Sequence, residues 1–152
     1  MRISAKVDYA VRAAVELASA KEGEAVKGDT IAEAQDIPLK FLENILGELK
    51  HTGIVSSRRG AHGGYWLAKP AEEIALADIV RAVEGQLADV RGQGAEDLKY
   101  SGAAAPLQQV WIAVRANLRS VLEETTLADV VSGKLPAKVS ELTEPAEAWA
   151  PR

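Results

Sequence analysis

Apolar residues recur at intervals of three and four between residues 4 and 20, and this period predicts a first amphipathic helix. Ser4 stands before the periodic run and is expected to cap the helix. Many positions on the apolar face are alanine, so this helix can approach its neighbours closely. The face that we expect to be buried consists of Val7, Ala10, Val11, Ala14, Leu17 and Ala18.

Two further helices follow, separated by a tight turn. Residues 30–35 predict a short helix, which Asp29 or Thr30 is expected to cap, and residues 38–52 predict a longer one. Pro38 suits the first turn of the longer helix, where a missing N–H costs nothing. This order is typical of a helix-turn-helix, whose second helix enters the DNA major groove, but a helical corner in another fold has the same pattern. The apolar stripe of the longer helix is Leu39, Leu42, Ile45, Leu46 and Leu49.

A hairpin pattern comes next. Residues 53–57 and 64–70 predict short strands, joined by the glycine-rich tip RRGAHG at residues 58–63. The glycines could cradle a nucleotide phosphate, but such a loop needs a Lys-Ser or Lys-Thr pair and a helix after it, and here a strand follows. A hairpin after a helix-turn-helix favours a wing that lies on a nucleic acid backbone; a solvated hairpin tip is the alternative. The candidate wing contacts are Ser57, Arg58, Arg59, Gly60, His62, Gly63 and Gly64.

The second half of the chain contains the longest helical stripe. Residues 72–85 predict a short helix, residues 86–105 show no clear period, and residues 106–124 predict a long helix. A small winged domain offers little surface to cover so continuous a stripe, so we expect a second copy of the same helix to pack on it. The stripe consists of Leu107, Val110, Trp111, Val114, Leu118, Val121 and Leu122.

The elements together predict a mainly α fold with a small β-wing. Residues 1–85 form the expected winged helix-turn-helix DNA-binding domain, and residues 86–105 connect it to the rest of the chain. Residues 106–133 contain the dimerisation helix and a final short helix that Thr126 caps. Residues 134–152 contain three prolines and are interpreted as a loosely ordered tail.

Composition narrows the functional classes. The net charge of −4 argues against a wholly basic nucleic-acid binder, yet residues 1–70 hold 10 Lys and Arg against 9 Asp and Glu, while residues 71–152 hold 8 against 13. An anionic partner is therefore directed to the first half. The chain has no cysteine, which excludes disulfides, thiolate metal sites and cysteine catalysis. No apolar run is long enough for a signal peptide or a membrane span, so a cytoplasmic protein is expected.

Three runs of the sequence together resemble one family of bacterial regulators. They are SAKVDYAVRAAVELA, IPLKFLENILGELKHTGIVSSRRGAHGGYWLAKPAEEIALADIVRAVEG and LEETTLADVVSG. They look like the Rrf-type winged helix-turn-helix regulators, relatives of the iron–sulfur-assembly, nitric-oxide-sensing and cysteine-metabolism repressors, over residues 2–133. The resemblance implies a homodimer with crossed long helices that binds a palindromic operator in double-stranded DNA.

The resemblance also assigns DNA contacts by position. The base-reading residues of the family match the second helix of the helix-turn-helix, and its wing residues match the glycine-rich tip. Thr30 and Lys50, at the two ends of the helix-turn-helix, are further candidates for DNA contacts. The base-reading set is Pro38, Lys40, Phe41, Glu43 and Asn44, and the wing set is Arg59, Gly60 and the glycines after them.

The sequence departs from the family at its metal ligands. Cluster-binding members carry three cysteines between the short helix and the long helix, and this chain has none. A second scheme in the family uses an acid and two histidines in the first helices, where the nearest residues here are Asp8, Arg12 and Glu33. His51 and His62 lie on the second helix and on the wing, so neither completes a buried ligand set. We therefore expect neither a metal nor another cofactor.

What remains of the pattern resembles the cluster-free, cysteine-metabolism type. Its signal would be a small-molecule effector, a partner enzyme or nothing direct. In place of a cluster, residues 86–105 would either leave a pocket or be filled by Leu98 and Tyr100, and we favour filling.

We expect a transcriptional regulator, specifically a repressor, that acts as a homodimer and spans no membrane. An enzyme is disfavoured, because His51 and His62 have no plausible Ser or Asp partner in their sequence context. The stronger alternative is a protein-interaction adaptor that keeps the winged-helix fold but has lost specific DNA binding. The weak basic balance of the first half favours the adaptor, whereas Lys40, Arg58 and Arg59 favour the regulator.

Overall fold

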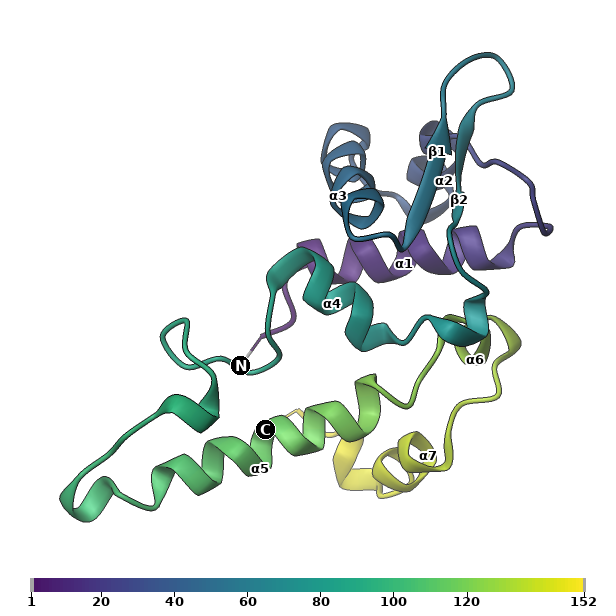
Figure 1. Ribbon diagram of the computed structural model, residues 1–152. Coiled ribbons are helices and arrows are strands. Elements are labelled where there is room, and N and C mark those ends of the chain that lie inside the picture. Colours follow the sequence, from purple (N-terminus) through teal and green to yellow (C-terminus); the bar gives the residue numbers. More distant parts are fainter. Residues whose placement is uncertain (1, 152) are drawn as a thin grey trace.

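A computed structural model describes residues 2–151 of the protein (Figure 1). Met1 and Arg152, the outer ends of the predicted first domain and of the predicted tail, lie outside the described residues. Over these residues the fold is mainly helical with one two-stranded antiparallel sheet, as predicted. Its helices and strands are α1 (Ala5–Ser19), α2 (Gly28–Gln35), α3 (Leu39–His51), β1 (Val55–Arg58), β2 (Gly64–Leu67), α4 (Leu76–Glu84), α5 (Leu107–Leu122), α6 (Leu127–Ser132) and α7 (Ala137–Thr143).

Helix α1 is the centre of the core. It begins at Ala5, and the hydroxyl oxygen of the N-cap Ser4 accepts a hydrogen bond from the backbone N–H of Val7 at 3.1 Å, as the sequence predicted. Figure 1 shows α1 lying between the helix-turn-helix and hairpin on one side and α4 on the other. Its buried face consists of Val7, Ala10, Ala13, Ala14 and Leu17, whereas Val11 and Ala18 are only half-buried.

Helices α2 and α3 form the helix-turn-helix, but α2 begins earlier than predicted. Neither Asp29 nor Thr30 is its cap: both lie inside the helix, and Lys27 occupies the N-cap position without a side-chain hydrogen bond. Helix α2 begins early because Val26, just before it, pairs with β2, and the chain turns from extended to helical structure directly after this pairing. Asp36, in the left-handed conformation with φ 51°, ends α2 and makes the turn.

Helix α3 begins at Leu39, directly after its N-cap Pro38. Four of the five stripe residues, Leu42, Ile45, Leu46 and Leu49, are buried as predicted. The fifth, Leu39, is 40% exposed, which corrects the prediction. It occupies the first position of the helix, beyond the edge of the face that packs on α1.

Strands β1 and β2 form the predicted hairpin, with Val55 opposite Leu67 and Arg58 opposite Gly64. The segment before α2 also pairs with β2, because Val26 and Tyr65 exchange two backbone hydrogen bonds of 2.8 Å each. The base of the hairpin is therefore tied to the entrance of the helix-turn-helix.

The segment between α4 and α5 contains two short 3-10 helices, Ala95–Asp97 and Gly102–Ala104. Leu98 is 1% exposed, and the Tyr100 hydroxyl accepts a hydrogen bond from the indole N–H of Trp111 at 3.1 Å. Leu98 therefore fills space in this segment as we favoured from the sequence, and Tyr100 is half-buried. Filling is incomplete, because residues 86–89 and Glu96 line hollows between this segment and the helices around it.

Helix α5 packs incompletely against its own chain, and no residue in it is fully buried. Leu107 and Val110 are 39% and 49% exposed, and the rest of the predicted stripe is half-buried. Helix α6 follows: Thr126 caps it through a reciprocal pair of hydrogen bonds with Asp129, and Gly133 ends it in the left-handed conformation.

The tail that we interpreted as loosely ordered contains a helix. Residues Ala137–Thr143 form α7, which contacts α5, and the 3-10 helix Ala146–Trp149 follows it. Most side chains of this segment are exposed. Within residues 2–151, no helix combines the length and the apolar character that crossing a membrane requires.

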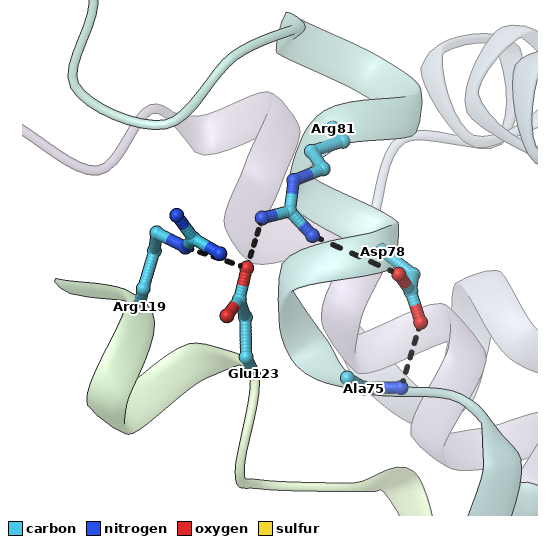
Figure 2. A network of polar contacts seen from close by, with 5 residues as sticks. All are labelled: Ala75, Asp78, Arg81, Arg119 and Glu123. Atoms are coloured by element: carbon cyan, nitrogen blue, oxygen red, sulfur yellow. Dashed lines mark hydrogen bonds and ion pairs between the residues drawn. The ribbon is translucent and has the colours of Figure 1, made fainter. Parts of the chain in front are cut away.

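A network of charged side chains links α4 to α5 (Figure 2). One carboxylate oxygen of Glu123 accepts hydrogen bonds from both Arg81 of α4 and Arg119 of α5, the latter at 2.9 Å. A guanidinium nitrogen of Arg81 also lies 3.9 Å from Oδ1 of Asp78. The other carboxylate oxygen of Asp78 accepts a hydrogen bond from the backbone N–H of Ala75 at the start of α4. The hydrogen bond from Arg81, which has the larger effect, and that from Arg119 hold the pKa of Glu123 below its ordinary value of 4.5.

Gly64 should be intolerant of any side chain. Its φ is +146°, and a Cβ would lie 2.6 Å from the carbonyl oxygen of Val26, inside the pairing that anchors the hairpin. Gly64→Ala is expected to lower the free energy of unfolding by about 1–3 kcal/mol, measured by urea denaturation. The control is Gly47→Ala in α3, where a Cβ meets nothing within 4 Å; there we expect a gain of up to about 1 kcal/mol. Equal stability of Gly64→Ala and the parent would contradict this account.

Glu123 should contribute stability that depends on pH. Because its folded-state pKa is lowered, the contribution is fully present above the ordinary value of 4.5 and is lost as the pH falls through the folded-state value. The melting temperature of Glu123→Gln is therefore expected to lie below that of the parent at pH 7 and to converge with it in acid. Glu124→Gln, an exposed neighbour without an ion pair within residues 2–151, should show no such pH-dependent difference.

Candidate nucleic-acid interface

The solvent-facing side of α3 carries polar side chains near its N-terminus. Lys40, Glu43 and Asn44 are exposed, whereas the opposite side of the helix is buried against the core. Pro38 and Thr30 are exposed as well. This placement leaves the exposed edge of α3 accessible to a partner. We call α3 the reading helix, because we expect from the sequence that it contacts base edges.

An aromatic contact positions Phe41, which is 42% exposed on the reading helix. Its ring meets that of Tyr9 edge to face, with 5.7 Å between the centroids. The guanidinium of Arg12 lies 5.0 Å from the Tyr9 ring centroid and donates to the carbonyl oxygen of Gln35 at 2.5 Å. Helix α1 thus supports both the reading helix and the turn before it.

The wing tip is restrained from within. Arg58 donates a hydrogen bond from Nε to the carbonyl oxygen of His62 at 3.0 Å, and its guanidinium lies 5.9 Å from the ring centroid of Trp66. Gly63 is buried there, and a Cβ on it would lie 2.5 Å from the carbonyl oxygen of Arg58. Arg59 is exposed and makes no hydrogen bond or ion pair within residues 2–151. Of the two arginines, Arg59 is the one available to a partner.

A groove lies between the wing, the reading helix and the start of α2. Four basic side chains line it, those of Lys27, Lys50, Arg58 and Arg59, against the single carboxylate of Asp29. Such a surplus of positive charge attracts an extended anion such as a nucleic acid backbone. The other lining residues are Gly28, Gly47, Ser57, Gly60, Gly63, Gly64 and Tyr65.

The structure therefore brings together only half of the residues predicted from the sequence. Seven of the predicted contacts line the groove: Lys50, Ser57, Arg58, Arg59, Gly60, Gly63 and Gly64. Glu43 and Asn44 instead line a second hollow along the reading helix, together with Gly47, Glu48 and His51. The remaining predicted residues, Thr30, Pro38, Lys40, Phe41 and His62, are exposed outside both hollows.

Sequence reasoning missed Lys27, Gly28 and Tyr65, which form one wall of the groove. The pairing of Val26 with Tyr65 places them there, and that contact spans 39 positions of the chain. The basic residue just before a short helix was the one local signal that could have suggested Lys27.

The residues that correspond to metal ligands elsewhere do not form a metal site here. Asp8 is paired with Arg12 at 2.9 Å, and Glu33 is exposed on α2. Within residues 2–151, no three His, Asp or Glu side chains gather in a way that could hold a metal ion. Because the chain also lacks cysteine, its residues do not fit an iron–sulfur cluster.

A helix-turn-helix followed by a wing, with a basic groove between them, is an arrangement of DNA-binding transcriptional regulators. Residues 3–133 match the Rrf2 family, which is described as "Iron-dependent Transcriptional regulator". The chain therefore belongs to the Rrf2 family. The donor set described above does not fit the iron in that description.

Relatives and solved structures agree with this family. The protein Rv1287 of Mycobacterium tuberculosis is 54% identical over 144 residues, which cover 95% of this chain and 89% of the relative. CymR of Bacillus subtilis is 35% identical over 87% of this chain and 91% of its own. The solved structure of that CymR, described as the global cysteine regulator, has a TM-score of 0.73 and covers 88% of this chain and 98% of its own at 31% identity. The structure of T. potens IscR has a TM-score of 0.72 at 32% identity and covers 88% of each chain.

Protein purified without reconstitution is expected to be colourless and free of stoichiometric iron. The reason is the donor set: the chain has no cysteine thiolate, and within residues 2–151 no cluster of carboxylates and imidazoles could hold a metal ion. Visible absorption spectra and elemental analysis of the isolated protein measure this directly. A brown preparation with iron at about one or two atoms per chain would require ligands that the sequence does not provide.

Proposed function

We propose that this protein is a sequence-specific DNA-binding regulator that represses transcription as a homodimer on a palindromic operator, without an iron–sulfur cluster. The observation that carries the proposal is the groove between wing and reading helix, with four basic side chains against one acidic one. This local surplus contrasts with the net charge of −4 for the whole chain. Family membership supports the same class of activity.

The wing contributes affinity for phosphate. Arg58 is held by His62 and Trp66, so its charge is fixed in place, while Arg59 is exposed and able to reach a backbone. Such contacts position a protein on a duplex without reading its sequence.

The reading helix contributes sequence preference. Lys40, Glu43 and Asn44 are exposed near its N-terminus, where a helix in the major groove meets base edges. Lysine favours the O6 and N7 atoms of guanine, asparagine favours adenine, and a carboxylate can accept from N4 of cytosine. A wrong base at one contact typically costs about 1–3 kcal/mol.

A second copy of the chain would cover the apolar stripe of α5. Its apolar stripe is exposed at Leu107 and Val110, and an apolar hollow continues the stripe towards α1 and α4. That hollow is lined by Leu118 and Leu122 together with Val7, Val11, Leu76 and Val80. Burying one large aliphatic side chain contributes about 1.5–3 kcal/mol, so a few per chain suffice for a stable dimer.

The variant Arg58→Ala/Arg59→Ala is expected to weaken binding to any duplex and to flatten its salt dependence. Each lost phosphate contact reduces the slope of log K against log salt by roughly 0.9. Binding is measured by electrophoretic shift on the promoter region of the protein's own gene. If the parent shifts no duplex at all, the adaptor alternative replaces the regulator; an unchanged slope in the variant would remove the wing from the interface.

Glu43→Ala is the matched control on the reading helix. It removes a charge from the same face of the protein but should leave the salt slope nearly unchanged. It is expected to change the order in which operator variants bind, because it removes a reader of bases. If that order is the same as for the parent, Glu43 is a solvated residue without a role in recognition.

Val110→Asp is expected to convert the dimer to a monomer of 16.2 kDa, measured by sedimentation equilibrium. Val110 is 49% exposed in the single chain, so the substitution should disturb association rather than folding. Ala116→Asp, on the opposite side of α5, introduces the same charge and should leave the mass at about twice that of one chain. Identical masses for the two variants would contradict dimerisation through this stripe.

A further inference from the structure

Three arginines converge on a small hollow between α4 and α5, away from the DNA-binding groove. Arg115 and Arg119 lie four residues apart on α5 and therefore on the same face of the helix, while Arg81 reaches the hollow from α4. The segment after α4 and the 3-10 helix Ala95–Asp97 close the hollow. The hollow is lined by Arg81, Gln86, Leu87, Glu96, Arg115 and Arg119.

These arginines have unused hydrogen-bonding capacity. Within residues 2–151, each donates one hydrogen bond: Arg81 and Arg119 to the same oxygen of Glu123, and Arg115 to Glu96. A guanidinium carries several N–H donors in a planar fork that matches carboxylate or phosphate oxygens two at a time. Figure 2 shows Arg81 and Arg119 approaching Glu123 from two sides. Arg81 in addition lies 3.9 Å from a carboxylate oxygen of Asp78. The other donors of the three guanidinium groups are left for another acceptor.

The surroundings strengthen what those donors can bind. The side chain of Arg115 is only 21% exposed, and Leu87, at 7% exposure, forms an apolar part of the wall. A charge pair on a partly desolvated guanidinium is stronger than one in open water. Three arginines in one hollow also stand out in the half of the chain that holds 8 basic residues against 13 acidic ones.

Glu96 occupies part of the hollow as an internal carboxylate. It belongs to the 3-10 helix Ala95–Asp97, its side chain is 54% exposed, and it pairs with Arg115. A hydrogen bond from its own backbone N–H has the largest effect on the pKa of Glu96, followed by the hydrogen bond from Arg115. Both hold that pKa below its usual range, so Glu96 is charged at neutral pH. An exposed carboxylate on a short turn is readily exchanged for an external one, because among the side chains within residues 2–151 Arg115 alone holds it.

We propose that this hollow binds a small anion with two or more carboxylate or phosphate groups, held by Arg81, Arg115 and Arg119 in exchange with Glu96. One group takes the place of Glu96 on Arg115, and a second meets the free donors of Arg81 and Arg119. The bound anion joins α4, which packs on α1 and α3, to α5. Its role as an effector of DNA binding rests on the proposed function, whereas its binding does not.

The test is isothermal titration calorimetry of the full-length protein without DNA, so its outcome is independent of the proposed function. Citrate and pyrophosphate are the probes, each titrated into chloride buffer at matched ionic strength. Saturable binding of either one is expected, and the probe that binds more tightly distinguishes carboxylate from phosphate recognition. Absence of saturable heat with both probes would overturn the proposal.

Variants locate the binding. Arg115→Gln/Arg119→Gln is expected to weaken the affinity for the probe about tenfold or more, since charged hydrogen bonds are lost. Arg91→Gln, the same substitution at an exposed arginine outside the hollow, should leave the affinity unchanged. If Arg91→Gln lost as much affinity for the probe as the double variant, the net charge of the protein would explain the effect, and the proposal would be overturned.

A third variant keeps the test decisive if the double substitution does not fold. Glu96→Gln removes the charge of the internal competitor, so it is expected to tighten binding of the probe severalfold. Unchanged or weaker binding in Glu96→Gln would contradict the exchange of Glu96 with the ligand. Far-ultraviolet circular dichroism of each variant confirms the helical fold before titration.

Discussion

The close approach of α1 to its neighbours is the constraint on which the rest of the structure depends. Ala10, Ala13 and Ala14 have no exposed surface, and α1 touches α2, α3, α4, α6 and β2. Small side chains permit this density of contacts, because a larger residue at any of these positions would separate the layers. The orientation of the reading helix relative to the wing, and of both relative to α4, follows from this one helix.

The hairpin is held by a second constraint, the backbone pairing of Val26 with Tyr65. That pairing starts α2 immediately afterwards and brings Lys27 beside Arg58 and Arg59. The basic character of the groove is therefore a product of three-dimensional structure: in the sequence, the first half of the chain is nearly neutral.

Local periodicity predicted the helices, the hairpin and the fold class well, because hydrophobic spacing and glycine positions determine them. It failed where distant contacts decide. Leu39 fits the stripe of α3 by spacing but lies beyond the edge of the packed face, and Thr30 suits a cap but falls inside α2. Lys27 in the groove and the meeting of Arg81 with Glu123 depend on long-range packing, for which a single sequence carries no periodic signal.

The anchored wing has a thermodynamic consequence. The pairing with Val26 fixes Tyr65 directly after Gly64, and Arg58 donates a hydrogen bond to the carbonyl oxygen of His62 across the tip, so the tip is restrained at both ends. A loop that is already ordered loses little conformational entropy when it meets a surface. The wing should therefore behave as a preformed template, and the bending needed for a close fit would fall on the duplex.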